Sequence, residues 1–235
     1  MQIETVTCPA PSPGGPFEVT LLKPPSPRGA LVFAAGRGGN PARHMELLRH
    51  LADQGIHVAA PHLGPVASPV PSGAELLERT HRLASVAARY CPPELGVAGM
   101  GHSLGTVCLL VLAGATAQTM AGEPVAFRAE RQFDRLVLLA PPTDFFRGPG
   151  ALDGVAAPLQ AWVGEADTIA PPAQADLLVA AMGQRTCVDV RIVENAGHFT
   201  FMDEPPPNIP EPHPARAAFQ RTLREETTNF LLQEE

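Results

Sequence analysis

One pentapeptide restricts the possible folds of this chain more than any other feature. It is a Gly-x-Ser-x-Gly segment, Gly101–Gly105, with Ser103 at its centre. The apolar run Leu95–Met100 precedes it, and a second apolar run of helical length, Thr106–Ala113, follows. Glycine on both sides of the serine lets a strand and a helix approach closely across a sharp turn. The sequence therefore predicts a strained serine after a strand, with the unpaired N–H groups of a helix N-terminus behind it.

Short β-type runs alternate with helical stretches along the chain, which is typical of a parallel sheet covered on both faces. We expect an α/β fold, with a mostly parallel, doubly wound sheet, helices on both faces and a single domain over residues 1–235. The expected strands are Ile3–Cys8 and Phe17–Leu22, which form an antiparallel edge, and Ala30–Ala34, His57–Pro61, Leu95–Met100, Leu136–Ala140, Leu159–Val163 and Val188–Val193. The expected helices are Pro41–Gln54, Ser72–Tyr90, Thr106–Ala113, Ala173–Met182 and Pro214–Leu232.

The connection after the strand Leu136–Ala140 is short. Only about eighteen residues separate it from the strand that starts near Leu159. This stretch is too short to hold an inserted helical cap. We therefore expect no cap domain and an open, shallow site.

Composition excludes several classes of protein. The chain is 45% hydrophobic and 17% charged, as an ordinary globular protein is, and its net charge of −7 argues against non-specific binding of nucleic acid. No apolar run approaches the roughly 20 residues that span a bilayer, and the N-terminus has no signal-peptide pattern. The four cysteines are scattered, so we expect reduced thiols and a cytoplasmic protein. Histidines and cysteines show no metal-ligand spacing, so we expect neither a metal nor a cofactor. A homo-oligomer stays open.

Two later segments supply the partners that a nucleophilic serine needs. A serine hydroxyl requires a base to take its proton, and the base requires a partner that sets its tautomer. Asp167 follows one expected strand and His198 follows the last one, giving the order serine, acid, histidine. Glu165 and Asp144 compete for the role of the acid. The Pro171-Pro172 context favours Asp167.

The segments GHSLG, GEADTIAPP and NAGHF make the chain resemble the α/β-hydrolase superfamily over nearly its whole length. The missing cap, the HFTF segment followed by prolines, and Gly36–Asn40 are similar to the dienelactone-hydrolase-like, chlorophyllase-like and platelet-activating-factor-acetylhydrolase-like groups. The resemblance implies a catalytic triad in which Ser103 is the nucleophile, His198 the general base and Asp167 its orienting partner. It also implies an oxyanion hole formed by the backbone N–H groups of Leu104 and Arg37.

Two positions depart from the family pattern. Ala35 stands where many relatives have histidine before the oxyanion-loop glycine, and a typical dienelactone hydrolase has a cysteine nucleophile where this chain has Ser103. The candidate substrate-binding residues are Arg37, Phe145 and Phe199. The Arg37 side chain is either solvated or in contact with an anionic substrate group. Phe145, Phe146, Phe199, Phe201 and Trp162 either line an acyl pocket or pack in the core.

The function that these residues predict is that of a carboxylesterase-type serine hydrolase, acting on small to medium esters through an acyl-enzyme. A perhydrolase or a lyase has the same triad, and a catalytically inactive binding protein has the same fold, so both alternatives stay open. The segment Gly99–Gly105 also half-matches a dinucleotide-binding fingerprint. Its third glycine comes one residue late and no acid ends a strand about 20 residues on, so a nicotinamide-dependent oxidoreductase is disfavoured.

Overall fold

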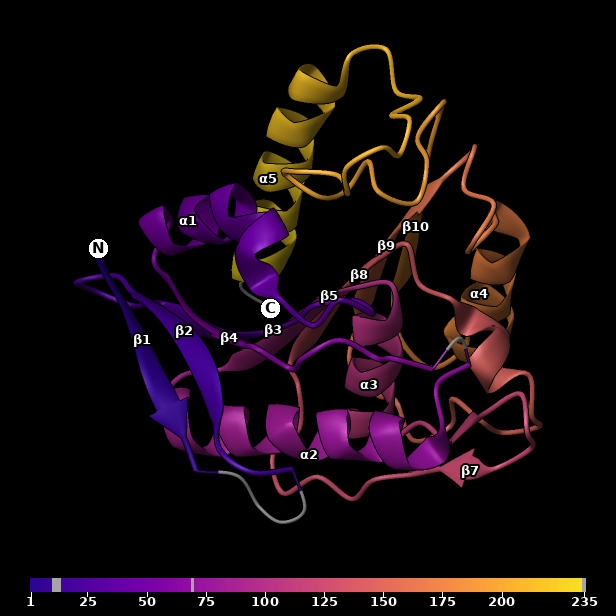
Figure 1. Ribbon diagram of the computed structural model, residues 1–235, viewed down its shortest axis with the longest axis horizontal. Coiled ribbons are helices and arrows are strands. Elements are labelled where there is room, and N and C mark those ends of the chain that lie inside the picture. The colour runs from indigo at the N-terminus through magenta and orange to yellow at the C-terminus, as the bar shows by residue number, and fades with distance from the viewer. Residues whose placement is uncertain (10–13, 69, 234–235) are drawn as a thin grey trace.

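The computed structural model describes residues 1–9, 14–68 and 70–233. Within them lies a sheet of eight strands in the order β1-β2-β4-β3-β5-β8-β9-β10 (Figure 1). The six strands from β4 to β10 in that order pair in parallel, whereas β1 and β2 form an antiparallel edge, as predicted. The strands are β1 (Gln2–Cys8), β2 (Phe17–Lys23), β3 (Gly29–Ala34), β4 (Ile56–Pro61), β5 (Val97–His102), β8 (Arg135–Leu139), β9 (Leu159–Gly164) and β10 (Val188–Val193).

Helices cover both faces of the sheet (Figure 1). The helices are α1 (Met45–Asp53), α2 (Gly73–Tyr90), α3 (Leu104–Leu112), α4 (Ala175–Met182) and α5 (Arg216–Leu232). One buried cluster joins α2, α3 and α4 to the sheet, and a second joins α1 and α5 to its other face. This is the doubly wound arrangement that the alternation of strands and helices predicts.

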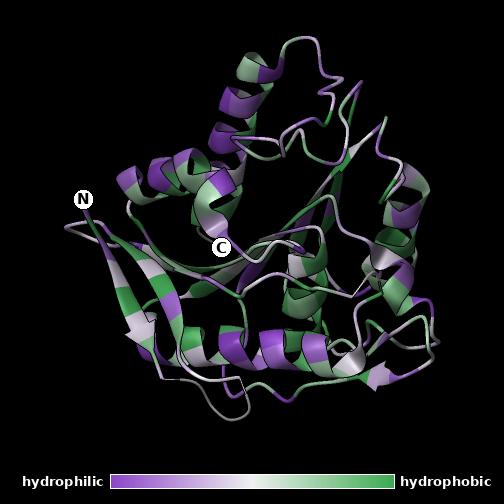
Figure 2. Ribbon diagram, in the orientation of Figure 1, coloured by the Kyte–Doolittle hydropathy of each residue, from purple (hydrophilic) through white to green (hydrophobic). Residues whose placement is uncertain are grey.

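Helix α2 shows how local sequence sets an element. Its first turn is a capping box, in which the Ser72 hydroxyl accepts from the Glu75 amide at 3.2 Å and the Glu75 carboxylate accepts from the Ser72 amide at 2.8 Å. Apolar residues then recur at helical spacing and turn Leu76, Leu83 and Val86 toward the sheet. Hydrophilic residues occupy the remaining surface, so the ribbon of α2 alternates between the two hydropathy colours (Figure 2).

Two details differ from the sequence prediction, and a third lies outside the described residues. The helix expected from Pro41 begins as a separate 3-10 turn, η1 (Pro41–His44), in which the Asn40 side chain accepts from the Ala42 amide at 2.9 Å. A small hairpin, β6 (Ala117–Gln118) with β7 (Pro124–Val125), was not expected, because two-residue strands carry no periodic pattern. The turn expected between the first two strands includes residues 10–13, which lie outside the described residues.

The carboxyl ends of the six parallel strands bring their following loops to one edge of the sheet. Among them are the loops that follow β3, β4, β5, β9 and β10, and such an edge is where open α/β sheets place their sites. The connection from β8 to β9 is described throughout and contains one short 3-10 turn, η2 (Thr143–Phe146), and no helical cap. Within the described residues, no helix is both long and apolar enough to cross a membrane.

Candidate active site

Ser103 lies between β5 and α3 in a backbone conformation that residues other than glycine rarely adopt. Its φ is 51° and its ψ is −126°. Such strain persists where the surroundings hold it, and here the Ser103 amide donates to the Leu139 carbonyl of β8 at 2.8 Å. A Cβ atom on Gly105 would lie 2.0 Å from the Ala34 carbonyl oxygen, so only glycine lets α3 pack this closely against β3.

The structure brings Ser103, His198 and Asp167 into one hydrogen-bonded row. The His198 Nε2 atom lies 2.8 Å from the Ser103 hydroxyl, and its Nδ1 atom lies 2.8 Å from Asp167 Oδ2. The other carboxylate oxygen, Oδ1, accepts from the amides of Ile169 and Ala170, both at 2.8 Å. Asp167 and His198 are buried, which excludes water from their contact. This arrangement fits Nδ1–H donating to the carboxylate and Nε2 accepting from the serine hydroxyl.

The two competing carboxylates lie elsewhere. Glu165 accepts from the Asn195 amide at 3.0 Å, which ties the loop after β9 to the loop that carries His198. Asp144 is exposed and accepts from Arg147 at 2.9 Å, within η2. Neither carboxylate contacts the His198 ring, so the geometry favours Asp167 as its partner.

Two further histidines continue from His198 into the protein. The rings of His198 and His102 are 5.1 Å apart between centroids, and those of His102 and His44 are 5.2 Å apart. His102 Nε2 donates to the His198 carbonyl at 2.9 Å, which links the strand before Ser103 to the loop that carries His198. Burial lowers the pKa of His102 well below its usual value, and it lowers the pKa of His44 to about 3. Both rings are therefore neutral at ordinary pH.

The loop after β3 lies directly against the turn that carries Ser103. A Cβ atom on Gly36 would be 3.2 Å from the Ser103 Cβ atom and 3.1 Å from the His102 carbonyl oxygen. Leu104 is the first residue of α3, so its amide has no acceptor within the helix. The expected oxyanion donors, the amides of Leu104 and Arg37, thus belong to the two segments that flank Ser103.

A cleft of about 740 Å³ opens over Ser103 and His198, a size that encloses a small-molecule ligand. The short β8–β9 connection takes no part in it. The larger apolar side chains that line the cleft are those of Pro65, Val66, Ile169, Phe199, Met202 and Pro206. Arg37, Arg43 and Glu204 line it as well. The shallow site expected from the missing cap is therefore walled by other segments, above all the loop after β3 and residues 202–206.

The aromatic candidates divide between the cleft and the core. Phe199 lines the cleft, and its ring meets His198 edge to face at 5.1 Å between centroids. Phe145, expected to bind substrate, lies away from the cleft and packs against the core cluster of α2, α3 and α4. Its position follows from η2, which turns the chain back toward the sheet immediately after β8. Phe146, Phe201 and Trp162 are buried in the core.

Hydrogen bonds hold the segment after His198 against the loop that carries His198. Thr200 Oγ1 accepts from the Gly197 amide at 2.8 Å and donates to Glu211 at 2.7 Å. The Arg43 guanidinium donates to the Pro205 carbonyl at 2.8 Å, and the Arg43 carbonyl accepts from the Asp203 amide at 2.7 Å. These bonds hold residues 202–206 as a fixed wall of the cleft.

The comparisons with known proteins bear on the fold. No family model matches the sequence, and no curated protein sequence matches it. Among solved structures, Thermogutta terrifontis esterase 2 phosphoramylated by tabun superimposes with a TM-score of 0.70 at 15% identity, covering 99% of this chain and 96% of that one. The chain has the α/β-hydrolase fold. The native form of that esterase gives a TM-score of 0.70 at 18% identity, covering 98% and 91% of the two chains. An alpha-beta serine hydrolase homologue from Coxiella burnetii gives 0.65 at 18% identity, covering 98% of each.

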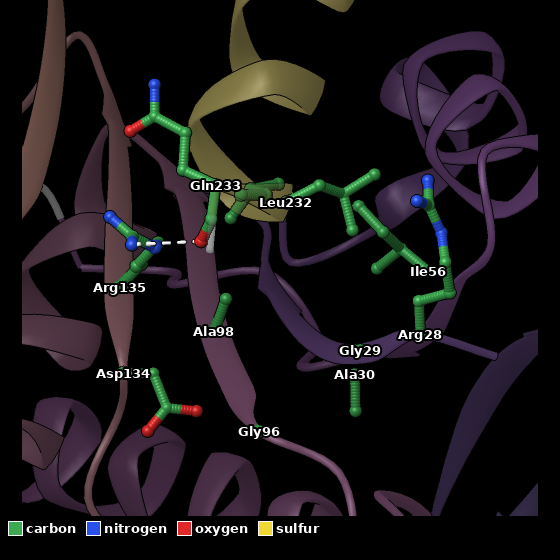
Figure 3. A pocket seen from close by; sticks show the side chains of 11 residues that line it. Arg28, Gly29, Ala30, Ile56, Gly96, Ala98, Asp134, Arg135, Leu232 and Gln233 are labelled. Atoms are coloured by element: carbon green, nitrogen blue, oxygen red, sulfur yellow. Dashed lines mark hydrogen bonds between the residues drawn. The ribbon is translucent and has the colours of Figure 1, made fainter. Parts of the chain in front are cut away.

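The α/β-hydrolase fold of this chain has a second cavity far from Ser103. It occupies about 340 Å³ at the amino ends of β3, β5 and β8, next to the end of α5 (Figure 3). Arg135 donates there to the Gln233 carbonyl at 3.1 Å, the contact drawn as a dashed line. Its lining contains no serine, threonine, cysteine or histidine, and Asp134 is its one carboxylate, so the triad of residue types found at Ser103 is not repeated there. The described residues also contain no cluster of three or more potential metal ligands.

The lowered pKa of His44 predicts a loss of stability in acid. An unfolded histidine binds a proton near pH 6.5, whereas folded His44 does so only near pH 3, so between these values the unfolded state takes up more protons. Unfolding should therefore become easier as the pH falls, by at most about 1.4 kcal/mol per pH unit from this residue. His44→Phe keeps an aromatic ring beside Phe33 and His102 and removes the titration. Denaturant unfolding at pH 6.5 and 5.0 should show a drop about 2 kcal/mol smaller in this variant.

The exposed His81, whose ring meets Phe127 edge to face, provides the control. His81→Phe measures how much exchanging a histidine for a phenylalanine at the surface changes the free energy of unfolding at each pH. Equal slopes in the wild type and in His44→Phe would show that His44 is not held neutral.

Proposed function

We propose that this chain is a serine hydrolase that cleaves small to medium carboxylic esters through an acyl-enzyme on Ser103. The observation that carries the proposal is the row Ser103–His198–Asp167, with both contacts at 2.8 Å, facing a cleft of ligand size. A serine in a strained turn, a histidine bonded to it and a buried carboxylate behind the histidine together make an activated nucleophile.

In the first half of the reaction, Ser103 Oγ attacks the ester carbonyl carbon while its proton passes to His198 Nε2. Asp167 stabilises the imidazolium that forms, because its Oδ2 atom accepts from Nδ1. The carbonyl oxygen gains negative charge and is bound by the amides of Leu104 and Arg37. The carbon–oxygen bond to the alcohol then breaks, and His198 gives its proton to the departing alkoxide oxygen.

In the second half, a water molecule takes the place of the alcohol. His198 accepts a proton from the water as its oxygen attacks the acyl carbon, and the same two amides bind the oxyanion again. The bond to Ser103 Oγ breaks, the serine regains its proton from His198, and the carboxylic acid leaves. Ser103, His198 and Arg37, which take part in these steps, border the cleft.

The comparisons support this reaction class without identifying the substrate. Thermogutta terrifontis esterase 2, which shares the fold, is described as phosphorylated by paraoxon and as propionate-bound. We infer that Ser103 of this chain reacts with the same kind of organophosphorus compound. The narrower dienelactone-hydrolase-like, chlorophyllase-like or platelet-activating-factor-acetylhydrolase-like grouping stays a prediction, as does the use of the Arg37 side chain toward an anionic substrate.

The walls of the cleft predict the range of acyl groups. Each methylene adds about 0.8 kcal/mol of binding only while it is being buried, and the apolar lining is a small set of side chains around Ser103. We expect kcat/KM for p-nitrophenyl esters to peak at about four to eight acyl carbons, where a chain would fill this lining. Rates that rise steadily to the palmitoyl ester, or jump above its critical micelle concentration, would contradict the expectation.

The same panel, extended to thioesters and lactones and paired with a fluorophosphonate probe, tests the proposed function. The wild type should hydrolyse esters and should lose activity in proportion to labelling of Ser103. A catalytically inactive binding protein would do neither. A perhydrolase or lyase would be labelled and would show little net ester hydrolysis, so the two assays together separate the alternatives.

A further inference from the structure

Arg79 is a buried cation on the sheet-facing side of α2. Its side chain is 4% exposed, and it occupies the stripe of the helix that also buries Leu76 and Leu83. The guanidinium donates to three backbone carbonyls: Gly36 at 2.9 Å, Arg37 at 3.0 Å, and Gly64. Among the described residues no carboxylate forms an ion pair with it, and its guanidinium hydrogen bonds go to these peptide carbonyls.

Two of these carbonyls belong to the loop that borders Ser103. The Gly36 carbonyl and the Arg37 N–H are parts of one planar, trans peptide unit, in which they point in opposite directions. When the carbonyl of this unit is bonded to Arg79, the N–H must point away from Arg79. The position of Gly36, 3.2 Å from the Ser103 Cβ atom when a Cβ is built on it, places this peptide beside the nucleophile.

We propose that Arg79 is a positioning residue for the oxyanion hole, which holds and polarises the Gly36–Arg37 peptide through its carbonyl. The proposal rests on the proposed function, in which the Arg37 N–H binds the oxyanion. A carbonyl that accepts from a cation makes the N–H of the same peptide a stronger donor, and the effect is larger where water is excluded. The positive charge of Arg79 also lies on the carbonyl side of this peptide, opposite the N–H that would bind the oxyanion, and it would stabilise the negative charge there.

The third carbonyl, that of Gly64, belongs to the loop after β4, which lies against the loop after β3. Gly39 has a φ of 69°, and a Cβ atom on it would lie 1.9 Å from the Gly64 carbonyl oxygen, so the two segments touch. The Val66 amide donates to the Arg37 carbonyl at 2.9 Å. Arg79 therefore connects the loop after β3 to the loop after β4. Because the carbonyls of two successive peptides, Gly36–Arg37 and Arg37–Gly38, both accept from Arg79, the loop cannot turn the Arg37 N–H away without breaking a bond to the buried guanidinium.

The burial of Arg79 has a cost that a merely structural role would not require. Desolvation lowers its pKa, because the charged form loses water, and a buried apolar side chain in its place would avoid that cost. The three carbonyl bonds offset part of it. The bond to the Gly36 carbonyl directs what remains of this charge at the peptide beside Ser103.

The test compares Arg79→Lys and Arg79→Met with a matched control, Arg131→Met. Arg131 likewise donates to three backbone carbonyls, those of Cys91, Pro92 and Leu95, but it lies away from the cleft. Three quantities are measured for each variant: kcat/KM per active site titrated with a fluorophosphonate, the inhibition constant of an alkyl trifluoromethyl ketone, and the thermal midpoint. The ketone forms a hemiketal oxyanion on the serine and so reports on the oxyanion hole.

Removing one oxyanion donor costs about 10²–10³-fold in rate, so a donor that is present but misdirected should cost about 10–100-fold. We expect this loss in kcat/KM for Arg79→Met, a parallel rise in the ketone inhibition constant, and partial retention in Arg79→Lys. Arg131→Met should lower the thermal midpoint and leave both kinetic quantities within about twofold. If Arg79→Met does not fold, the proportionality between kcat/KM and the inhibition constant is read from the wild type and Arg79→Lys.

Three results would overturn the inference. They are unchanged kinetics in the Arg79 variants, a loss of kcat/KM without a change in the ketone constant, and an equal kinetic loss in Arg131→Met. In each case the wild type would still hydrolyse esters and react with the fluorophosphonate, so the proposed function would stand. A wild type that did neither would refute the proposed function and the role of Arg79 with it.

Discussion

Replacing Ser103 by alanine is expected to lower kcat for a p-nitrophenyl ester by about 10⁴-fold or more, because the members of a triad act as a unit. Without the hydroxyl, His198 has no nucleophile to deprotonate, and the reaction can proceed only through slow attack by water held near the oxyanion hole. The measurement is initial-rate kinetics on the purified variant. A minor wild-type contamination must be excluded by titration with the fluorophosphonate.

The fold should survive this substitution. The Ser103 hydroxyl contacts His198, whereas the turn itself is held by the backbone bond to Leu139 and by the close approach of Gly105 to Ala34. Alanine should therefore leave the thermal midpoint within a few degrees of the wild type. Retention of most of the esterase activity in Ser103→Ala would falsify the assignment of the nucleophile.

The second large effect is expected from Asp167→Asn. An amide in this place can donate to His198 Nδ1 where the carboxylate accepts from it, which favours the wrong tautomer and removes the charge that stabilises the imidazolium. In a serine protease the corresponding change costs about 10⁴-fold in kcat, and we expect a loss of similar size here. The substitution keeps the shape of the side chain, so the amides of Ile169 and Ala170 keep an acceptor.

Glu165→Gln and Asp144→Asn are the matched controls. Glu165 accepts from the Asn195 amide, a bond that glutamine also accepts, and Asp144 contacts only the exposed Arg147 among the described residues. Both variants should stay within about tenfold of the wild-type kcat, well short of the loss expected for a triad member. If Asp144→Asn proves to be the crippled enzyme instead, the acid comes from the loop after β8, and the Asp167 contact serves only to hold the loop.

Much of the fold follows from patterns that are local in sequence. The capping box at Ser72, the apolar runs of the central strands and the glycines around Ser103 each set an element without help from the rest of the chain. The order of the strands β1 and β2 at an antiparallel edge was also expected and is confirmed. The split of the helix after Pro41 into η1 and α1 was missed, because a proline at a helix start is equally compatible with either kind of turn.

The site was harder to predict wherever a role depends on contacts between distant segments. Ser103, Asp167 and His198 stand in recognisable segments after strands, so their meeting at one sheet edge could be expected. Phe145 also follows a strand, and only the path of η2 in the structure shows that it packs against the core. Arg79 leaves one trace in the sequence, a cation within the apolar stripe of an amphipathic helix. Its partners are backbone carbonyls, which no sequence pattern displays.

Arginine guanidinium groups donate hydrogen bonds to backbone carbonyls and so hold the loops around the cleft in place. Arg79 binds those of residues 36, 37 and 64, Arg37 those of Val66 and Ser68, and Arg43 those of Glu204 and Pro205. Every amino acid supplies a carbonyl. The side chains of Val66 and Glu204, which line the cleft, can therefore be replaced while the hydrogen bonds to their backbone carbonyls are kept. For the proposed esterase, substrate preference is therefore open to redesign at these lining side chains, separately from the framework that holds Ser103, His198 and Asp167.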